Sequence, residues 1–467
     1  MSRELIDAWL DARRDDMVED VKNLVKIDSQ RTEALPGKPY GEGAAKAVAA
    51  AEELMKGYGF KVTNYDNYVV TGDFGGEEKA LDILAHLDVV PVTEDWTVTA
   101  PFEPIEKDGK LYGRGTADDK GPAVAAIYAV RAIKELGLPM KKGVRIILGS
   151  DEECGSSDLE YYYSKEVEAP YTFSPDADFP LINVEKARLA KTFCAETTES
   201  DALPRVLSFN SGAKVNVVPA NAEVKLLGAS KAEVEAAAQK VQEATGVAFT
   251  VAEEADVVTV SAKGVAAHGS TPEHGKNALV AMLVLVKDLQ LAQTEGLERL
   301  LSVLKLFPYG DTTGEALGVA MSDEVSGALS SCLSILNYDG KVLEGAFDMR
   351  APICATNENL TDVVRSKMEA EKITMEAGEL TPAHYVPEDS RLVQTLLESY
   401  ELYTGIKGKP LYTGGGTYVH ELERGVAFGC ATVGVDNRMH GDDEFMEIDV
   451  IVKSAKIFAD AILKLCN

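Results

Sequence analysis

Cysteine is scarce in this chain: there are six among 467 residues, and no two of them form a C-x-x-C pair. Scattered thiols argue against a thiolate zinc site and a disulfide framework, and they favour a reduced, cytoplasmic location. Long apolar runs are also missing, since no segment has the 18 or more consecutive apolar residues of a membrane helix. Residues 1–27 mix acidic residues with apolar residues at helical spacing, which predicts an amphipathic helix and not a signal or transit peptide.

Basic residues are outnumbered: 47 lysines and arginines face 76 aspartates and glutamates, which gives a net charge of −29. Such a surface repels nucleic acid and anionic membranes, so neither is expected as a partner. Histidine is as rare as cysteine, and the position of each one is therefore informative. The six histidines are His86, His268, His274, His384, His420 and His440.

The pattern of apolar residues predicts an α/β fold with a separate inserted domain, since the chain is too long for one ordinary core. Helix-like and strand-like segments alternate over the first 185 residues, as in a layered α/β domain with a mixed, partly parallel sheet. The segments that define this pattern are the helices 44–58 and 121–137 and the strands 80–87, 142–150 and 171–175.

From residue 186 to 377 the strands alternate apolar and polar residues, as strands with one solvated face do. Strands followed by a helix, near 230–245 and again near 359–376, predict two related α+β subdomains. The α/β texture returns after 378, with helices at 389–405 and 448–465 and a strand at 424–435. The expected architecture is a catalytic domain of residues 1–185 plus 378–467, interrupted by an α+β lid domain of residues 186–377.

Polar residues gather where the predicted strands of the first domain end. In "AHLDVVP", His86 and Asp88 are two residues apart, and in a strand such residues share a face, so the carboxylate could hold one imidazole nitrogen. The same spacing would also be expected if His86 and Asp88 only formed a structural hydrogen bond at the end of a strand. Other strand ends and turns add further acids and a histidine: Asp118, Asp119, Asp151, Glu152, Glu153, Asp176, Asp178 and His440.

Ligands in open α/β sheets bind at the carboxyl ends of strands, so these side chains are expected on one rim. That much negative charge in one place is costly unless cations neutralise it. Histidine and carboxylate ligands without thiolate suit zinc, manganese or cobalt. Two histidines with carboxylates able to bridge predict two metal ions.

The motifs "AHLDVVP", "YGRGTADDKGP", "DEECGS", "PDADFP", "AAHGSTPEHGKNA" and "MHGDDE" occur in this order along essentially the whole chain. Together they resemble the M20 metallopeptidase family, and within it the PepV-type bacterial dipeptidases, including the carnosinase-like group. The resemblance implies a peptidase with two divalent metal ions, zinc being expected and manganese or cobalt being alternatives.

Carried over to this sequence, the resemblance implies that Asp118 bridges both metals. His86 and Asp176 would complete one metal site, and Glu153 and His440 the other. Glu152 would be the general base toward a metal-activated water, and Asp88 would orient His86. The family also has a cis peptide after the bridging aspartate, which is expected here between Asp118 and Asp119.

In the lid, the resemblance assigns substrate binding to His268, Asn216 and Arg350, with His268 at the oxyanion of the intermediate. The glycine-rich "YTGGGTYVH" would offer backbone N–H groups to the substrate, foremost that of Gly415. The family often has arginine where this chain has His420, so no role is assigned to that position. A lid of two subdomains suggests a monomer.

Three functions remain open from the sequence. The first is a dipeptidase that releases the N-terminal residue of dipeptides with a free N-terminus. The second is an N-acyl-amino-acid or succinyl-diaminopimelate deacylase of the same family, which would need the same metal centre. The third is a metal-dependent binding protein, against which the intact Glu152 argues.

Overall fold

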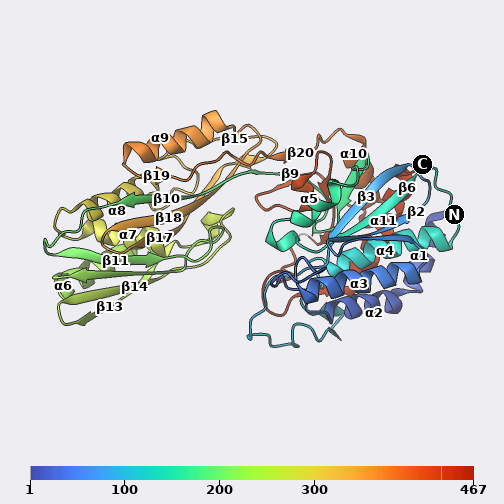
Figure 1. Cartoon of the computed structure of the whole chain (residues 1–467), viewed down its shortest axis with the longest axis horizontal. Coiled ribbons are helices and arrows are strands. Elements are labelled where there is room, and N and C mark those ends of the chain that lie inside the picture. The colour runs from blue at the N-terminus through green and yellow to red at the C-terminus, as the bar shows by residue number, and fades with distance from the viewer. Residues whose placement is uncertain (1, 433) are drawn as a thin grey trace. The chain divides into compact units, whose positions relative to one another are not determined.

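The computed structural model describes residues 2–432 and 434–467, which divide into two compact units (Figure 1). The first unit contains the chain up to Val184, residues His384–Leu411, and the chain from Gly416 onward. The second unit contains Glu185–Ala383 and Tyr412–Gly415. Among the described residues, none of the helices combines the length and the apolar character needed to span a membrane.

The first unit is built on a mixed sheet in which β6, β3, β7 and β22 run parallel, while β1 and β2 continue it antiparallel beyond β6. These strands are β1 (Lys61–Tyr65), β2 (Val69–Phe74), β3 (Lys79–His86), β6 (Gly143–Gly149), β7 (Tyr171–Ser174) and β22 (Val426–Ala427), with β9 (Ile182–Glu185) and β20 (His384–Tyr385) beyond them. The predicted α/β class with a mixed, partly parallel sheet is therefore confirmed.

Helices cover the sheet of the first unit, and β3 is therefore buried along nearly its whole length. The helices are α1 (Ser2–Asp11), α2 (Arg14–Val25), α3 (Glu42–Gly57), α4 (Lys120–Glu135), α5 (Ser157–Tyr163), α10 (Arg391–Thr404) and α11 (Ile448–Leu465). Helix α4 packs against α11, and both contact β3 (Figure 1). Short strands β4 (Ile105–Lys107), β5 (Lys110–Tyr112) and β24 (Phe445–Glu447) form a small separate sheet.

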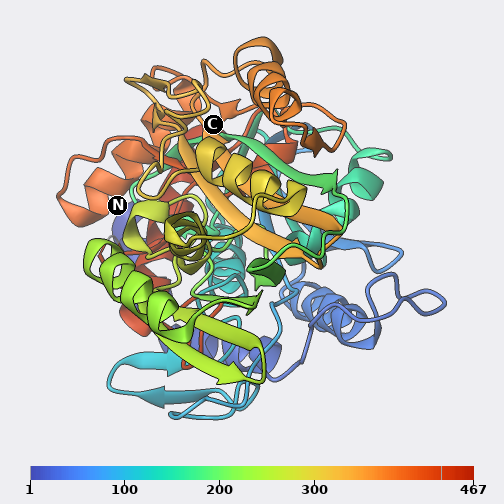
Figure 2. The same cartoon turned by 90° about the vertical axis from the view of Figure 1, so that its left-hand side faces the viewer.

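The second unit is built on an antiparallel sheet of eight strands in the order β13-β14-β12-β11-β17-β18-β10-β19, and β15 (Ser322–Asp323) and β16 (Gly327–Ala328) form a separate pair. The strands are β10 (Ala187–Glu196), β11 (Arg205–Ser211), β12 (Asn221–Leu227), β13 (Ala248–Glu254), β14 (Val257–Lys263), β17 (Ser330–Tyr338), β18 (Val342–Ala351) and β19 (Thr374–Met375). Its helices are α6 (Lys231–Thr245), α7 (Ala278–Asp288), α8 (Glu295–Leu306) and α9 (Asp362–Ala370). Helix α6 packs on β13, as both views show (Figures 1 and 2).

Two predicted elements are wrong in their extent. The helix expected over residues 1–27 is two helices, because the chain turns after α1, and this turn lets Leu10 and Met17 both enter the same core. The strand expected over 424–435 is only β22 and β23 (Cys430–Ala431), since Gly429 between them has φ +81° and leaves the extended conformation. Val433, which that prediction included, lies outside the described residues.

Candidate metal centre

The strand ends of the first unit place the predicted ligands. His86 is the last residue of β3, and Asp176 follows β7 by two residues. Glu153 lies in a 3-10 turn (Glu152–Cys154) shortly after β6, and Asp118 lies just before α4. Strands β6, β3 and β7 are neighbours and parallel, so their carboxyl ends lie at one edge of the sheet. His440 joins them from the loop before β24.

The five side chains form two groups that share Asp118. His86, Asp118 and Asp176 make one group, and Asp118, Glu153 and His440 make the other; in each, the potential ligand atoms lie within 4.8 Å of one another. In the first group, His86 Nε2 lies 2.9 Å from Asp118 Oδ1 and 3.6 Å from Asp176 Oδ2. In the second, His440 Nε2 lies 2.9 Å from Asp118 Oδ2 and 3.3 Å from Glu153 Oε1. The structure thus brings together all five residues that the sequence analysis selected as ligands.

Two acids of this cluster, Glu153 and Asp176, have pKa values raised by their surroundings. Burial, followed by the charge of Asp118, raises the pKa of Glu153 to about 7 and raises the pKa of Asp176 above its ordinary value. Hydrogen bonding to Asp118 and Glu153 raises the pKa of His440 to about 11. In the absence of cations, these pKa shifts therefore favour bound protons on Glu153, Asp176 and His440.

Asp118 differs from its neighbours. Burial acts to raise its pKa, but hydrogen bonds to His440 and His86 outweigh burial and hold the pKa below its ordinary value. An ionised carboxylate between two imidazole nitrogens has the character of a bridging ligand. The buried Glu153 Oε1 has the imidazole of His440 as its partner, 3.3 Å from Nε2, and the two atoms would face the same cation. These features fit two divalent cations, one for each group, bound through oxygen and nitrogen atoms.

Asp88 holds His86 and the following loop in a way the sequence did not predict. His86 Nδ1 lies 3.0 Å from the main-chain oxygen of Asp88 and 3.5 Å from its carboxylate. A carbonyl oxygen only accepts, so the contact places the hydrogen on Nδ1 and leaves Nε2 as the atom that faces Asp118. The carboxylate of Asp88 also accepts the N–H groups of Glu152 and Glu153, at 3.2 and 3.1 Å. The strand alternation behind the prediction does not extend to Asp88, because β3 ends at His86.

The carboxylate of Glu152 lies beside the ligand groups but belongs to neither of them. It makes no hydrogen bond or ion pair with any residue that the structure describes. Burial, with the charges of Asp176, Glu153 and Asp118 adding to it, raises its pKa well above the ordinary value, although His86 opposes this. A carboxylate of raised pKa beside the ligand cluster is suited to accept and return a proton.

The peptide bond between Asp118 and Asp119 is cis, as expected. The buried carboxylate of Asp119 accepts the N–H of His86 at 3.1 Å, so it supports the end of β3. Asp119 thus contacts the main chain of one member of the cluster and belongs to neither ligand group.

The sequence analysis missed Asp158, in the first turn of α5. Its buried carboxylate accepts the N–H groups of Ser150 and Asp151, at 2.6 and 3.1 Å, and the hydroxyl of Tyr418 donates to it. Asp158 and Asp88 together therefore hold four consecutive N–H groups of the segment that carries Glu152 and Glu153. An aspartate at the start of a helix is so common that its sequence position gives no sign of this role.

The four predicted substrate-binding residues lie in the second unit. Gly269 N–H donates to the main-chain oxygen of Asn216 at 2.7 Å, which joins Asn216 to the segment that carries His268. The imidazole Nδ1 of His268 lies 2.6 Å from the hydroxyl of Ser270. Arg350 and the glycine-rich loop lie close to this segment.

Arg350 lies in β18 and is buried. Its guanidinium donates to the carboxylate of Asp348 at 3.0–3.1 Å and to the main-chain oxygen of Gly414. A Cβ atom on Gly414 would lie 2.5 Å from Cβ of Ser270, so the glycine-rich loop and the His268 segment are in close contact. The N–H of Gly415 donates to Thr413 Oγ1 at 3.0 Å. We call Asn216, His268, Ser270, Arg350, Gly414 and Gly415 the lid cluster.

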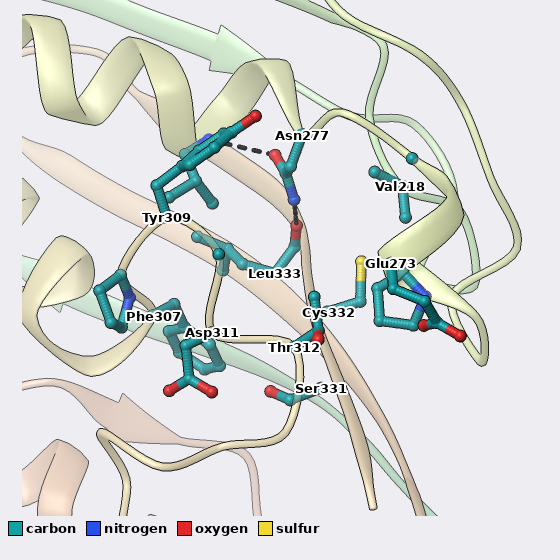
Figure 3. A pocket seen from close by; sticks show the side chains of 15 residues that line it. Val218, Glu273, Asn277, Phe307, Tyr309, Asp311, Thr312, Ser331, Cys332 and Leu333 are labelled. Carbon is teal, nitrogen blue, oxygen red and sulfur yellow. Dashed lines mark hydrogen bonds between the residues drawn. The ribbon is translucent and has the colours of Figure 1, made fainter. Parts of the chain in front are cut away.

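A separate cavity of about 280 Å³ lies in the second unit beside the segment that follows His268 (Figure 3). Val218, Phe307 and Leu333 contribute to its walls, and none of the predicted site residues lines it. The side-chain amide of Asn277 in this wall bonds to Leu333 O and to Val280 N–H, as the dashed lines show. The amide of Asn277 thus already has hydrogen-bond partners within the protein. The cavity is separate from the residues of the site described above.

The fold and the cluster define a hydrolase of the metal-dependent type, and comparison with known proteins gives its family. Residues 83–464 match the family described as Peptidase family M20/M25/M40, and the chain belongs to this family. The chain is similar to the Beta-Ala-Xaa dipeptidase of Lactobacillus delbrueckii subsp. lactis, with 32% identity over 97% of both chains.

The solved structures that are similar to nearly the whole chain include two peptidases. One is human carnosine dipeptidase 1, with a TM-score of 0.60 and 17% identity, covering 100% of this chain and 99% of that one. The other is the aminoacylhistidine dipeptidase of Vibrio alginolyticus, with a TM-score of 0.58 and 13% identity, covering 96% of each chain. At these identities the likeness concerns the fold. The family and the relatives confirm the resemblance seen in the sequence and the expected enzyme class, a metal-dependent dipeptidase.

Proposed function

We propose that this chain hydrolyses dipeptides with a free N-terminus and releases the N-terminal residue. The observation that carries metal-dependent hydrolysis is the sharing of Asp118 between two ligand groups, each completed by one imidazole and one further carboxylate, and the similarity to a Beta-Ala-Xaa dipeptidase favours a dipeptide as the substrate. Two divalent cations bound by these groups would supply Lewis acidity toward the scissile carbonyl and lower the pKa of a water molecule near neutrality. Zinc is our proposed metal, with manganese and cobalt as alternatives.

Glu152 is the proposed general base. Its carboxylate has no other partner among the described residues, and its main-chain N–H is held by Asp88 at 3.2 Å. It accepts the proton of the attacking water and then delivers this proton to the leaving amine, so the residue ends the cycle in the form in which it began. Asp88 orients His86 through its main-chain oxygen and fixes the loop of Glu152 through its carboxylate.

Residues of the lid cluster are the proposed substrate contacts. The imidazole of His268 is assigned to the oxyanion of the tetrahedral intermediate, where a hydrogen bond strengthens in the transition state. Asn216, Arg350 and the N–H of Gly415 are assigned to binding the rest of the dipeptide. A monomer and a cytoplasmic location remain predictions from the sequence.

The alternative is a deacylase of the same family that acts on N-acyl amino acids or on succinyl-diaminopimelate. The similarity to a Beta-Ala-Xaa dipeptidase over 97% of the chain favours the dipeptidase. Both reactions use the same cations and the same base, so the metal centre does not separate them.

A substrate panel tests the proposal. The protein, loaded in turn with Zn²⁺, Mn²⁺ or Co²⁺, is assayed with Ala-His, β-Ala-His, Leu-Gly-Gly, N-acetyl-alanine and N-succinyl-diaminopimelate. We expect cleavage of the two dipeptides and much slower cleavage of the tripeptide. Hydrolysis of the acylated compounds alone would replace the dipeptidase with the deacylase.

A further inference from the structure

Three acidic residues follow His440 closely; Asp442 and Asp443 bind the loop 93–98, and Glu444 binds the segment 115–118. Asp442 accepts a hydrogen bond from the hydroxyl of Thr93. Asp443 accepts the N–H groups of Thr97 and Val98, both at 2.8 Å. The third residue, Glu444, turns toward the segment that carries Asp118. The run of acids after His440 is therefore a set of attachments and not a solvated turn.

Glu444 is fully buried and binds the main chain next to Asp118. Its carboxylate accepts the N–H groups of Gly115 at 3.0 Å, Ala117 at 2.9 Å and Asp118 at 3.2 Å. Several N–H donors on one carboxylate, away from water, make strong charge-assisted hydrogen bonds. The main chain at Asp118 is thus fixed relative to the residues that follow His440.

Arg114 also links the segment before Asp118 to the residues that follow His440. Its side chain is 2% exposed, and its Nη1 donates to Glu444 Oε2 at 2.7 Å. Its Nη2 donates to the main-chain oxygen of Gly441 at 2.9 Å, one residue after His440. The planar guanidinium reaches both acceptors at once, which a lysine ammonium does not do with the same geometry.

His440 itself has few restraints. Its side chain is 59% exposed, and the two contacts that its imidazole makes with described residues are those to Asp118 and Glu153. Packing therefore contributes little to the position of the imidazole, which depends on where the main chain at His440 lies. The bond from Arg114 to Gly441 acts on this main chain directly.

We infer that Arg114 and Glu444 are positioning residues that set the distance between Asp118 and His440, and with it the affinity of the second ligand group for its cation. This rests on the proposed function, because it assigns a role toward the proposed metal pair. The first group depends less on this pair, since His86 ends β3, Asp176 lies two residues after β7, and His86 faces the oxygen of Asp118 that His440 does not.

A buried ion pair also stabilises a fold, so the test needs a matched control. Arg145 and Asp82 form another buried pair in the same unit, with contacts of 2.8 and 2.7 Å and no atom in either ligand group. Asp82→Asn breaks this pair as Glu444→Gln breaks the other. Arg114→Lys is the milder variant, because it keeps the charge and removes the double contact.

The experiment is a titration of the metal-free full-length protein with Co²⁺, followed by visible absorption and by competition with a chelating dye. The wild type is expected to bind two equivalents. In Glu444→Gln and Arg114→Lys the first equivalent keeps its affinity within threefold, and the second weakens by about 10–100-fold with an altered spectrum. Asp82→Asn lowers the melting temperature but binds both equivalents as the wild type does.

Two results would overturn the inference while leaving the proposed function in place: both equivalents bound as in the wild type, or both weakened equally in the two variants. A wild-type protein that binds fewer than two equivalents would remove the metal pair itself, and with it both the proposed function and the inference.

Discussion

Asp118 Oδ2 lies 2.9 Å from Nε2 of His440, although a whole inserted unit separates the two residues along the chain. The other oxygen of the same carboxylate lies 2.9 Å from Nε2 of His86. One side chain thus faces two imidazole nitrogens with different oxygens, and both ligand groups depend on it. Three predictions follow from this arrangement, and a fourth concerns the lid cluster.

Replacing Asp118 should remove both cations, because each group loses its shared ligand. Asp118→Asn is expected to lower the metal content after gel filtration from two ions per chain to fewer than one, as measured by elemental analysis. Asp178→Asn, close by in sequence to Asp176 but in neither ligand group, is the control and should keep two ions. Two ions retained in Asp118→Asn would contradict the bridging role.

Glu152→Gln should separate proton transfer from metal binding. The loss of a general base costs about 10²–10⁴-fold in kcat. We expect a fall in this range with KM within threefold of the wild type and unchanged metal content. The exposed Glu160 of α5 provides the control, since Glu160→Gln should change neither constant. An unaltered kcat in Glu152→Gln would refute the assigned base.

The metal-free protein should lose stability as the pH rises. Burial raises the pKa of Glu153 from 4.5 to about 7 in the folded chain, so the stabilisation from its bound proton is complete below about pH 4.5 and is lost by about pH 7. Hydrogen bonding raises the pKa of His440 from 6.5 to about 11, so its contribution is complete below about pH 6.5 and declines toward pH 11. Both changes have the same sign.

In the presence of a chelator, the melting temperature should therefore be lower at pH 8 than at pH 5. The difference should shrink in Glu153→Gln, which cannot titrate. Cations replace the protons in the loaded protein, so the same pH change should matter less there, and metal binding at pH 6 should release protons into the buffer. A chelated protein that is more stable at pH 8 than at pH 5 would contradict the assignment of these shifts.

Gly414→Ala should disturb the lid cluster without touching the metals. The added Cβ would lie 2.5 Å from Cβ of Ser270, whose hydroxyl is bonded to His268, so that segment has to move. We expect kcat/KM to fall by about tenfold or more, since small misplacements of binding groups are costly. Gly57→Ala, in α3 with nothing within 4 Å of the new Cβ, is the matched control. Equal activity of the two variants would exclude Gly414 from the cluster's function.

Much of the fold could be read from local patterns. The helix 448–465 matches α11 residue for residue, and the predicted strand 80–87 overlaps β3 closely, because apolar periodicity and end signals agree there. The prediction failed where one residue interrupts a good pattern. Gly429 at φ +81° ends an apolar run that otherwise reads as a single strand, and the sequence alone does not show this conformation.

The gathering of acids and histidines at one edge was predictable because β6, β3 and β7 are parallel neighbours whose ends share that edge, and the resemblance to the family selected the five proposed ligands among them. The residues that position the proposed ligands through hydrogen bonds could not be predicted from the sequence. Asp158 and Glu444 act through main-chain N–H groups, and such contacts depend on where a loop passes in space. Asp88 was chosen for a contact of its carboxylate with His86, which is present at 3.5 Å, but its contacts with the loop of Glu152 and its main-chain contact with His86 were not foreseen.

The proposed ligands are nitrogen and oxygen atoms only, since none of the six cysteines lies in either group. A donor set without sulfur discriminates little among first-row dications beyond their general order of affinity. If this set is the metal site, the growth medium selects the ion more than the polypeptide does. Cultures rich in zinc and cultures rich in manganese would then yield, from one gene, catalysts that differ in rate.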